Sequence, residues 1–273
     1  MAITNFIPEL WSAATLDRWV QMNVFPGIVD RRYEGLATKG NTVHITGVVP
    51  PTVKDYKAAG RVTTADAISD TGVDLLIDQE KSVDFYVDDI DEVQAAGSLM
   101  DYTNAAADAL IIDADQFIAE LLVADGNVMP YSSLSTGDNA FDALADARKL
   151  LNLQNAPAAN RYVVVNAAFE RLLLDSDSKL TAVDKSGDNQ GLRNATVGRI
   201  LDFQVVTSNN LPETDSPQFV AFHPSAIAYV SQIDKVEALR AEQKFADRVR
   251  MLHVYGGKVV RPEGVVVFNE LGT

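Results

Sequence analysis

The sequence contains no cysteine, which excludes disulfide bonds, thiolate metal sites and thiol catalysis. It also lacks an apolar run of about 18 residues, the length that a membrane-crossing helix needs. Its start, MAITNFIPEL, lacks the basic beginning and the apolar core of a signal peptide. With 47% hydrophobic residues and a mean hydropathy of −0.01, the composition predicts an ordered soluble protein. Its 273 residues suffice for one large domain or two small ones.

Sequence motifs of catalysis and cofactor binding are also missing. There is no G-x-G-x-x-G and no G-x-S-x-G, and the run at residues 256–258 lacks the first glycine and the final Ser/Thr of a phosphate-binding loop. The three histidines (His44, His223 and His253) are far apart, and each lies on or beside an apolar strand. This spacing favours structural histidines over metal ligands. The sequence therefore predicts no enzyme, no metal site and no cofactor.

Positive charge is scarce and unevenly distributed. The net charge of −15 argues against tight binding of a phosphate backbone over the whole surface. The stretch between Lys81 and Arg148 contains 14 acids and no lysine or arginine, whereas residues 235–261 carry seven bases against three acids. Either the acidic stretch is a solvated helix face, or basic segments of this chain or of a neighbouring copy lie along it. The candidates near the end of this chain are Arg248, Arg250 and Arg261.

The longest regular pattern covers residues 91–126, which predict one continuous helix, roughly 54 Å long. No proline interrupts it, its only internal glycine is Gly97, and Gly126 supplies a stop signal. Apolar residues recur at alternating steps of three and four, which places them on one face. We call this predicted helix the spine. Three acids recur every seven residues along the edge of that face: Asp101, Asp108 and Asp115.

Two alternating segments before the spine predict a long hairpin. Residues 41–49 alternate with a period of two, and a second alternating run extends from Val73 to Asp88. The polar residues 51–72 between them predict a flexible tip. A two-stranded hairpin alone in water is marginally stable, so this one needs support from its own body or from a partner. The tip carries three clustered bases: Lys54, Lys57 and Arg61.

Residues 1–40 predict an arm with one short helix that ends at Pro26-Gly27. The arm holds both tryptophans of the chain, Trp11 and Trp19, which are large side chains that favour burial. An arm this short has little core of its own. The tryptophans therefore dock either onto the same chain or onto another subunit.

Behind the spine, helical and strand patterns alternate, which predicts an α/β or α+β body. The expected helices cover residues 141–153 and 167–174. The expected strands cover residues 162–165, 203–207, 219–222 and 226–230. Residues 248–268 alternate again and predict paired closing strands that turn at Gly256-Gly257.

This order of elements resembles the major capsid protein of tailed bacteriophages, which has the Hong Kong 97-type shell fold. The start AITNFIPELWS resembles the arm of that family, and VDRRYEGLATKGNTVHI resembles the segment that enters its extended loop. The segments GRILDFQVVTSNNLP, FHPSAIAYVSQI and VYGGKVVRPEGVVVF resemble its body strands and closing strands. The resemblance covers nearly the whole chain, and it depends on the number and order of these segments.

The resemblance implies an α+β fold with five parts. They are an N-terminal arm at residues 1–40, an extended two-stranded loop at 41–90, a spine helix of the peripheral domain at 91–126, an axial α/β domain at 127–232, and closing strands of the peripheral domain at 233–273. Family members with a cleaved leader place it before the arm, which here begins at residue 2. The resemblance therefore implies either a separate scaffolding protein or a sequence that is already mature.

The function implied by the resemblance is a coat protein whose copies form pentamers and hexamers and close an icosahedral shell around double-stranded DNA. Its partners would be other copies of itself, a scaffolding protein, a portal and a decoration protein, with DNA close by but not specifically bound and no membrane. It would assemble in the bacterial host cytoplasm and reside in the virion. The alternative is the shell of an encapsulin compartment, which shares the fold.

These interpretations place the functional residues at contacts between subunits. We expect the basic tip of the hairpin to meet acids on or near the spine of an adjacent copy. The candidate contact residues are Trp11, Trp19, Arg31, Arg32, Lys54, Lys57, Arg61, Asp101, Asp108 and Asp115.

Overall fold

The computed structural model describes residues 23–34, 41–48, 52–63, 65–66, 70–88, 99–130, 134, 136–175, 198–241 and 245–269. In these ranges the helices are α1 (Phe25–Ile28), α3 (Leu99–Asp125), α4 (Gly137–Leu153) and α5 (Ala167–Leu173). The strands are β1 (Thr42–Val48), β2 (Asp70–Leu76), β3 (Gln79–Asp88), β4 (Asn127–Val128), β5 (Arg161–Val165), β6 (Arg199–Ile200), β7 (Phe203–Thr207), β8 (Gln218–Phe222), β9 (Ile227–Arg240), β10 (Ala246–Val259) and β11 (Val265–Asn269).

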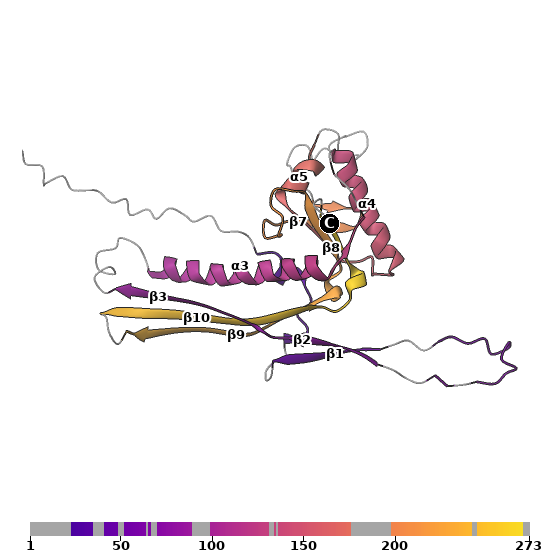
Figure 1. Ribbon diagram of the computed structural model, residues 1–273, viewed down its shortest axis with the longest axis horizontal. Helices are drawn as coiled ribbons and strands as arrows, with labels where there is room; N and C mark the ends of the chain where they lie inside the picture. Colours follow the sequence, from indigo (N-terminus) through magenta and orange to yellow (C-terminus); the bar gives the residue numbers. More distant parts are fainter. Residues whose placement is uncertain are drawn as a thin grey trace, which may run out of the picture.

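The described strands form three sheets arranged around one long helix (Figure 1). β1 and β2 form an antiparallel hairpin, and β3, β10 and β9 form an antiparallel sheet in that order. A mixed sheet has the order β4-β11-β8-β5-β7-β6. The helix α3 lies along the three-stranded sheet, and the six-stranded sheet with α4 and α5 stands at its far end (Figure 1). The α+β architecture is therefore confirmed.

The helix α3 confirms the predicted spine over 27 residues, which corresponds to about 40 Å. Residues 91–98, the predicted first turns, lie outside the described residues. Toward the three-stranded sheet, Ala106 and Leu110 pack against Val249 and Met251. Toward the six-stranded sheet, a second set of buried residues on the helix joins a different cluster: Ala114, Ile118, Ala119 and Leu122. The spine thus buries two faces and connects two sheets.

The six-stranded sheet is buried on both faces, as expected for strands that are almost entirely apolar. On β8, for example, Phe219 and Ala221 face the cluster of α4 and α5, whereas Val220 and Phe222 face the cluster of α3. The predicted strands 162–165, 203–207 and 219–222 are confirmed to within one residue. The helix expected at 141–153 begins earlier, at Gly137, because the side chain of Thr136 accepts a hydrogen bond from the Asn139 amide and caps it.

The alternating run from Val73 to Asp88 has the predicted two faces, but it does not form one strand. It breaks at Ile77 and Asp78, and the chain passes from β2 in the hairpin to β3, which pairs with β10. Side chains on the Val73 side are buried or half-buried through both strands, and those on the other side are exposed. The expected loop at 41–90 therefore contains a hairpin and, in addition, a strand of the three-stranded sheet.

The prediction of a turn at Gly256-Gly257 is wrong, because β10 continues through both residues to Val259. A Cβ atom on Gly256 would lie 2.2 Å from the Leu76 carbonyl oxygen and 2.7 Å from Ile77 Cα. Gly256 is thus needed where the end of β2 crosses close over β10. The expected boundary at residue 233 also falls within β9, and β11 pairs with β8 in the six-stranded sheet instead of with β10.

The sequence also predicts helix ends at Pro26-Gly27 and at Gly126. Pro26-Gly27 lies within the short helix α1. The helix that is predicted to end there falls mostly outside the described residues. Gly126 does follow the end of the spine, as predicted. A Cβ on it would meet Val267 Cγ2 at 2.5 Å and the Leu122 carbonyl oxygen at 2.6 Å, so close packing against β11 requires the glycine.

The buried carboxylate of Asp115 joins three distant parts of the chain. Its Oδ1 accepts hydrogen bonds from the Val24 and Phe25 amides at 2.8 and 2.7 Å, and its Oδ2 accepts one from Asn210 Nδ2 at 2.6 Å. The side chain is fully buried. Burial raises the pKa of Asp115 and outweighs the hydrogen bonds, led by that from Asn210, which lower it. The root of the arm is thereby fixed to the spine and to the loop after β7.

Replacing Gly256 with alanine should destabilise the subunit by about 1–3 kcal/mol, because the new Cβ collides with backbone atoms that cannot rotate away. Thermal unfolding of the unassembled subunit measures the effect. Gly72→Ala in β2 is the matched control, since a Cβ there meets no atom within 4 Å. That variant should be neutral or stabilised by up to about 1 kcal/mol. Equal melting temperatures for the two variants would contradict the close crossing.

The variant Asp115→Asn should change the pH dependence of stability. Because burial raises the folded-state pKa of Asp115 above its ordinary value of 3.8, the folded chain binds a proton more readily than the unfolded chain between these two values. The original chain should therefore gain stability relative to the variant as pH falls through this window, by at most about 1.4 kcal/mol per pH unit. Denaturant unfolding of both proteins from pH 7 to 4 measures this, and a constant difference would refute it.

Candidate functional site

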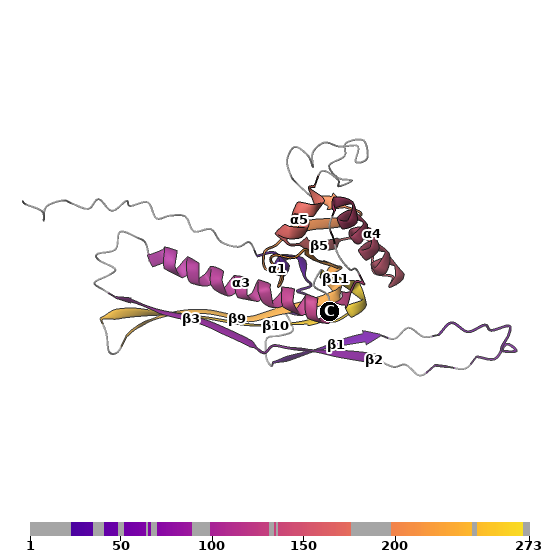
Figure 2. The same cartoon turned by 45° about the horizontal axis from the view of Figure 1, so that its top comes forward.

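The hairpin of β1 and β2 carries a tip, residues 52–63 and 65–66, away from both sheets (Figures 1 and 2). Its root packs on the body, where Val43, Ile45 and Leu75 form a buried cluster with Val230 and Val254. The support that the two-stranded hairpin needs is therefore provided at its base by the same chain. The tip itself projects beyond that support.

Hydrogen bonds within the tip hold it in one defined turn. The Asp55 carboxylate accepts from the Lys57 and Ala58 amides at 2.9 and 3.1 Å, and the Arg61 amide donates to the Tyr56 carbonyl at 2.9 Å. Gly60 and Arg61 complete the turn with φ values of 66° and 63°. Left-handed backbone of this kind persists only where the surrounding bonds impose it.

The carboxylate of Asp66 closes the base of the tip. It accepts a hydrogen bond from the Thr52 amide at 3.1 Å and pairs with the Lys54 ammonium. The hydrogen bonds from Lys54 and then Thr52 lower the pKa of Asp66, so the carboxylate stays charged at neutral pH. The described part of the tip is thus a small closed loop, and the predicted flexibility of residues 51–72 stays a prediction.

Apolar side chains point into solvent from this ordered tip. The side chains of Val53, Tyr56 and Val62 are 101%, 54% and 66% exposed. Exposed apolar residues are ordinary when scattered singly, whereas here three lie on one loop at the end of a projecting hairpin. We call Val53, Tyr56 and Val62 the apolar tip residues.

The three predicted basic residues of the tip have different local roles. Lys54 is paired with Asp66 of the same tip, Lys57 follows the Asp55 turn, and Arg61 occupies the left-handed position. The structure brings all three into one loop, as expected. Their contact with acids of an adjacent copy is a proposal, taken up below.

More of the spine acids than predicted form hydrogen bonds or ion pairs within their own chain. Asp115 is buried and fully bonded inside the subunit, so it is not available to a neighbour, and its assignment as an edge residue is wrong. Ile118 and Leu122 follow it at helical spacing and place it beside an apolar stripe, but this pattern does not show that the carboxylate itself is buried. Asp113 accepts a hydrogen bond from Tyr255 at 2.5 Å. Burial, followed by this bond to Asp113, raises the pKa of Tyr255.

The remaining spine acids lie nearer the surface. Asp125 pairs with Lys258 at 3.2 Å, Asp108 is half-buried, and Asp101 lies on the helix with its side chain outside the described part. Asp108 is partly accessible, so its contact with a neighbour stays a prediction, as does that of Asp101.

Two arginines that were expected to approach the spine from the closing strands bind elsewhere. Arg248 pairs with Asp84 on β3, and Arg250 pairs with Glu237 on β9 at 2.6 Å. Their neighbours in sequence, Val249 among them, pack against α3, so the cross-strand pairs occupy the opposite face of the sheet. Pairing of the spine acids with these two arginines is therefore wrong.

The two arginines before the hairpin also have partners close by. Arg32 pairs with Asp30 at 2.5 Å, and Arg31 with Glu34 at 2.7 Å. Arg31 and Glu34 are both partly exposed, so their pair contributes only about 0–1 kcal/mol. The Asp30 side chain is only 9% exposed, so exchange of its partner Arg32 for a group on a neighbouring subunit is less favourable. Trp11 and Trp19 lie outside the described residues.

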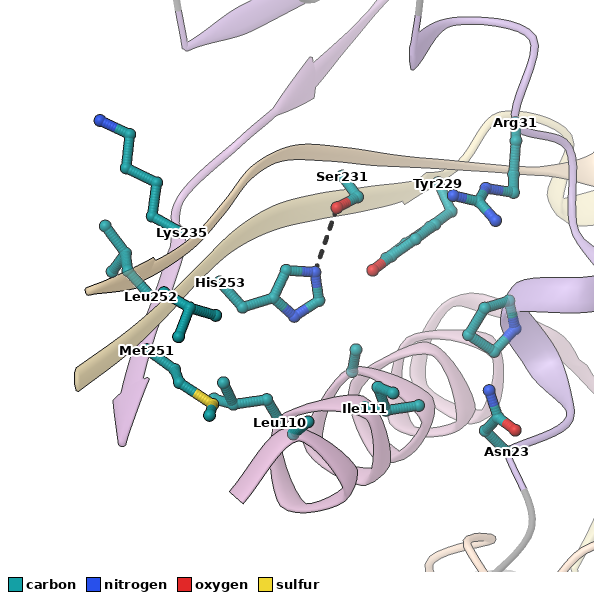
Figure 3. Close-up of a pocket in the computed structure, with 14 residues that line it drawn as sticks. Asn23, Arg31, Leu110, Ile111, Tyr229, Ser231, Lys235, Met251, Leu252 and His253 are labelled. Atoms are coloured by element: carbon teal, nitrogen blue, oxygen red, sulfur yellow. Dashed lines mark hydrogen bonds between the residues drawn. The ribbon is translucent and has the colours of Figure 1, made fainter. Parts of the chain in front are cut away.

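A groove of about 350 Å³ lies between the spine and the three-stranded sheet (Figure 3). Leu110 and Ile111 of α3 form one wall, while Val236 of β9 and Met251 of β10 form the other. A polar pair lies between the walls, in which the Ser231 hydroxyl oxygen and His253 Nε2 are 3.1 Å apart. The sequence pattern did not predict this groove, since it exists only where helix and sheet diverge. We call it the spine groove.

No arrangement for chemistry accompanies these surfaces in the described part of the chain. Within those ranges, no three His, Asp or Glu side chains gather as a metal site would require. The described helices include none that is long and apolar enough to cross a membrane. His253 bonds to Ser231 and His223 bonds to Ser225, which are structural roles.

Comparison with known proteins identifies the architecture. A family model described as phage capsid protein matches residues 76–268. A solved structure from Mycobacterium phage Che8 is 62% identical, covers 100% of both chains and superposes with a TM-score of 0.93. A search of curated proteins finds no match.

More distant structures share the fold. The capsid of cyanophage P-SCSP1u is 17% identical with a TM-score of 0.81, covering 97% of this chain and 92% of that chain. A virus-like particle from Pyrococcus furiosus is 16% identical with a TM-score of 0.55, covering 85% and 87%. At these identities the likeness concerns the fold alone. The family match and the 62% identity over the whole chain show that this chain belongs to the phage capsid protein family and has the Hong Kong 97-type fold.

Proposed function

We propose that the chain is the major shell subunit of a tailed phage head, and that its copies form pentamers and hexamers in an icosahedral shell around double-stranded DNA. The observation that carries this proposal is the closed hairpin tip, which holds three apolar side chains in solvent far from its own core. A fixed, exposed apolar loop fits a surface on another copy. A net charge of −15 would keep packaged DNA from adhering to the shell.

The family supports a structural role in the virion capsid and self-association. A scaffolding protein, a portal, a decoration protein and assembly in the host cytoplasm belong to the proposal. The encapsulin alternative has less support, since the family match and the 62% identical structure are both of phages. Electron microscopy of the purified protein tests the proposal: closed shells of phage size without enzyme cargo support it, and small shells around enzyme cargo or single subunits would contradict it.

The apolar tip residues should be needed for assembly and dispensable for folding. Val53→Ser with Val62→Ser should leave the melting temperature of the unassembled subunit unchanged, because both side chains are exposed there. The same double variant should reduce the yield of closed shells, measured by sedimentation and microscopy. Val53→Ile with Val62→Ile is the matched control, which keeps the apolar surface and should assemble normally. Normal shell yield from the serine variant would show that the tip is solvated.

Among the lysines of the tip, Lys57 should have the larger effect on assembly, because Lys54 already forms an ion pair with Asp66 in the same loop. Lys57→Glu should weaken assembly and make it more sensitive to salt, because exposed pairs contribute about 0–1 kcal/mol each and are screened beyond about 8–10 Å. Asp101→Lys in the same chain should partly restore assembly if the tip meets the spine of a neighbour. Sedimentation of assembly mixtures at two salt concentrations measures both effects.

The control for this experiment exchanges the internal pair, Lys54→Asp with Asp66→Lys, which keeps the net charge of the tip. It should assemble like the original chain. Unchanged assembly of Lys57→Glu at both low and moderate salt would refute the contact between tip and spine.

A further inference from the structure

Each wall of the spine groove carries an exposed apolar side chain. Ile111 on its helical wall is 41% exposed and Val236 on its sheet wall is 67% exposed. Water in contact with facing apolar walls is unfavourable, and an apolar side chain placed between them would bury both. The groove is thus shaped for an apolar insertion.

The lining combines apolar walls with one polar spot. In the walls, Leu110 and Met251 are buried, whereas Ser231 and His253 place a hydroxyl and an imidazole between the walls. Tyr229 adds its ring beside them (Figure 3). A tryptophan fits such a site, because its large apolar ring carries a single N–H that needs an acceptor when it is buried.

The described chain begins at the end of this groove. Asn23, the first described residue, lines the groove together with Pro26. Trp19 lies four residues earlier, so its Cα can be at most about 14 Å from that of Asn23. The groove extends along α3 from Ala114 to Ala107, a distance of about 10 Å. Trp19 is therefore close enough in the chain to reach the part of the groove that runs along α3 in its own subunit.

The rim of the groove is basic. Arg31 and Lys235 lie at the rim, one on each side of the polar spot (Figure 3). Asp17 and Arg18 both precede Trp19, so their charges balance and do not by themselves favour a basic rim. A cation beside the face of an indole also contributes about 0.5–1 kcal/mol at an exposed site.

We propose that Trp19 occupies the spine groove of its own subunit and anchors the arm to the spine before any neighbour binds. This inference concerns the single subunit and does not depend on the proposed shell function. The bond network at Asp115 fixes Val24 and Phe25 to the same helix, next to Asn23 and Pro26, which line the groove. Arm and spine then form one unit on which other subunits assemble.

Tryptophan fluorescence of the unassembled subunit tests this anchoring. The chain has only two tryptophans, so the variant Trp11→Phe leaves Trp19 as the sole reporter. Its emission should lie at short wavelength and resist quenching by acrylamide in dilute, unassembled subunits. A change of either wall, by Ile111→Asp or by Val236→Asp, should shift the emission to longer wavelength and increase quenching. The two walls belong to different elements and both side chains are exposed, so circular dichroism should show that each variant folds.

Leu153→Asp is the matched control, since Leu153 is 67% exposed but lies on α4, and it should leave the emission of Trp19 unchanged. Emission at long wavelength in the original subunit would overturn the proposal. Short-wavelength emission that appears only in assembled shells would also overturn it, and would assign the groove to an arm or a hairpin tip of a neighbouring copy. Microscopy of the same samples scores shell formation separately, so failure of the anchoring and failure of the shell function are distinguishable.

Discussion

Burial of two faces of one helix is the constraint on which the rest of the subunit depends. The spine packs Ala106 and Leu110 against the three-stranded sheet, and Ile118 and Leu122 against the six-stranded sheet. Each fully buried aliphatic side chain contributes about 1.5–3 kcal/mol. Neither sheet can shift without exposing part of that surface. The helix therefore works as a rigid link that fixes the angle between the two halves of the molecule.

The Asp115 carboxylate is buried within this apolar interface, and it is stable there only because its oxygens accept hydrogen bonds. Asp115 is out of water, which by itself opposes ionisation, yet three N–H donors converge on its two oxygens. Removing a donor would leave a buried group without its bond, at a cost of about 1–3 kcal/mol. The geometry thus ties the start of the described chain, the spine and the loop at Asn210 together. A purely apolar contact would hold the same elements with less directional precision.

The hairpin divides into a supported root and a projecting tip. The root gains its stability from a cluster that includes residues of β9 and β10, and the Gly256 backbone lets β2 cross close over that sheet. The tip has no such cluster among the described residues, and its shape comes from local hydrogen bonds around Asp55 and Asp66. Exposed apolar side chains are thereby held at a distance from the core. This separation suits a protein whose larger interfaces form between copies.

Periodicity in the sequence by itself determined the class of fold, the long spine, the faces of the run from Val73 to Asp88 and most body strands, because these depend on local spacing of apolar residues. The order of these segments also determined the family resemblance. Tertiary structure alone decided which strands pair, since the run from Val73 to Asp88 has the same alternation whether its partner is β1 or β10. It also decided that Gly256 is a crossing point and that Asp115 is buried. The bonding partners of Asp115 lie 90 or more residues away in sequence, and no local pattern records such a distance.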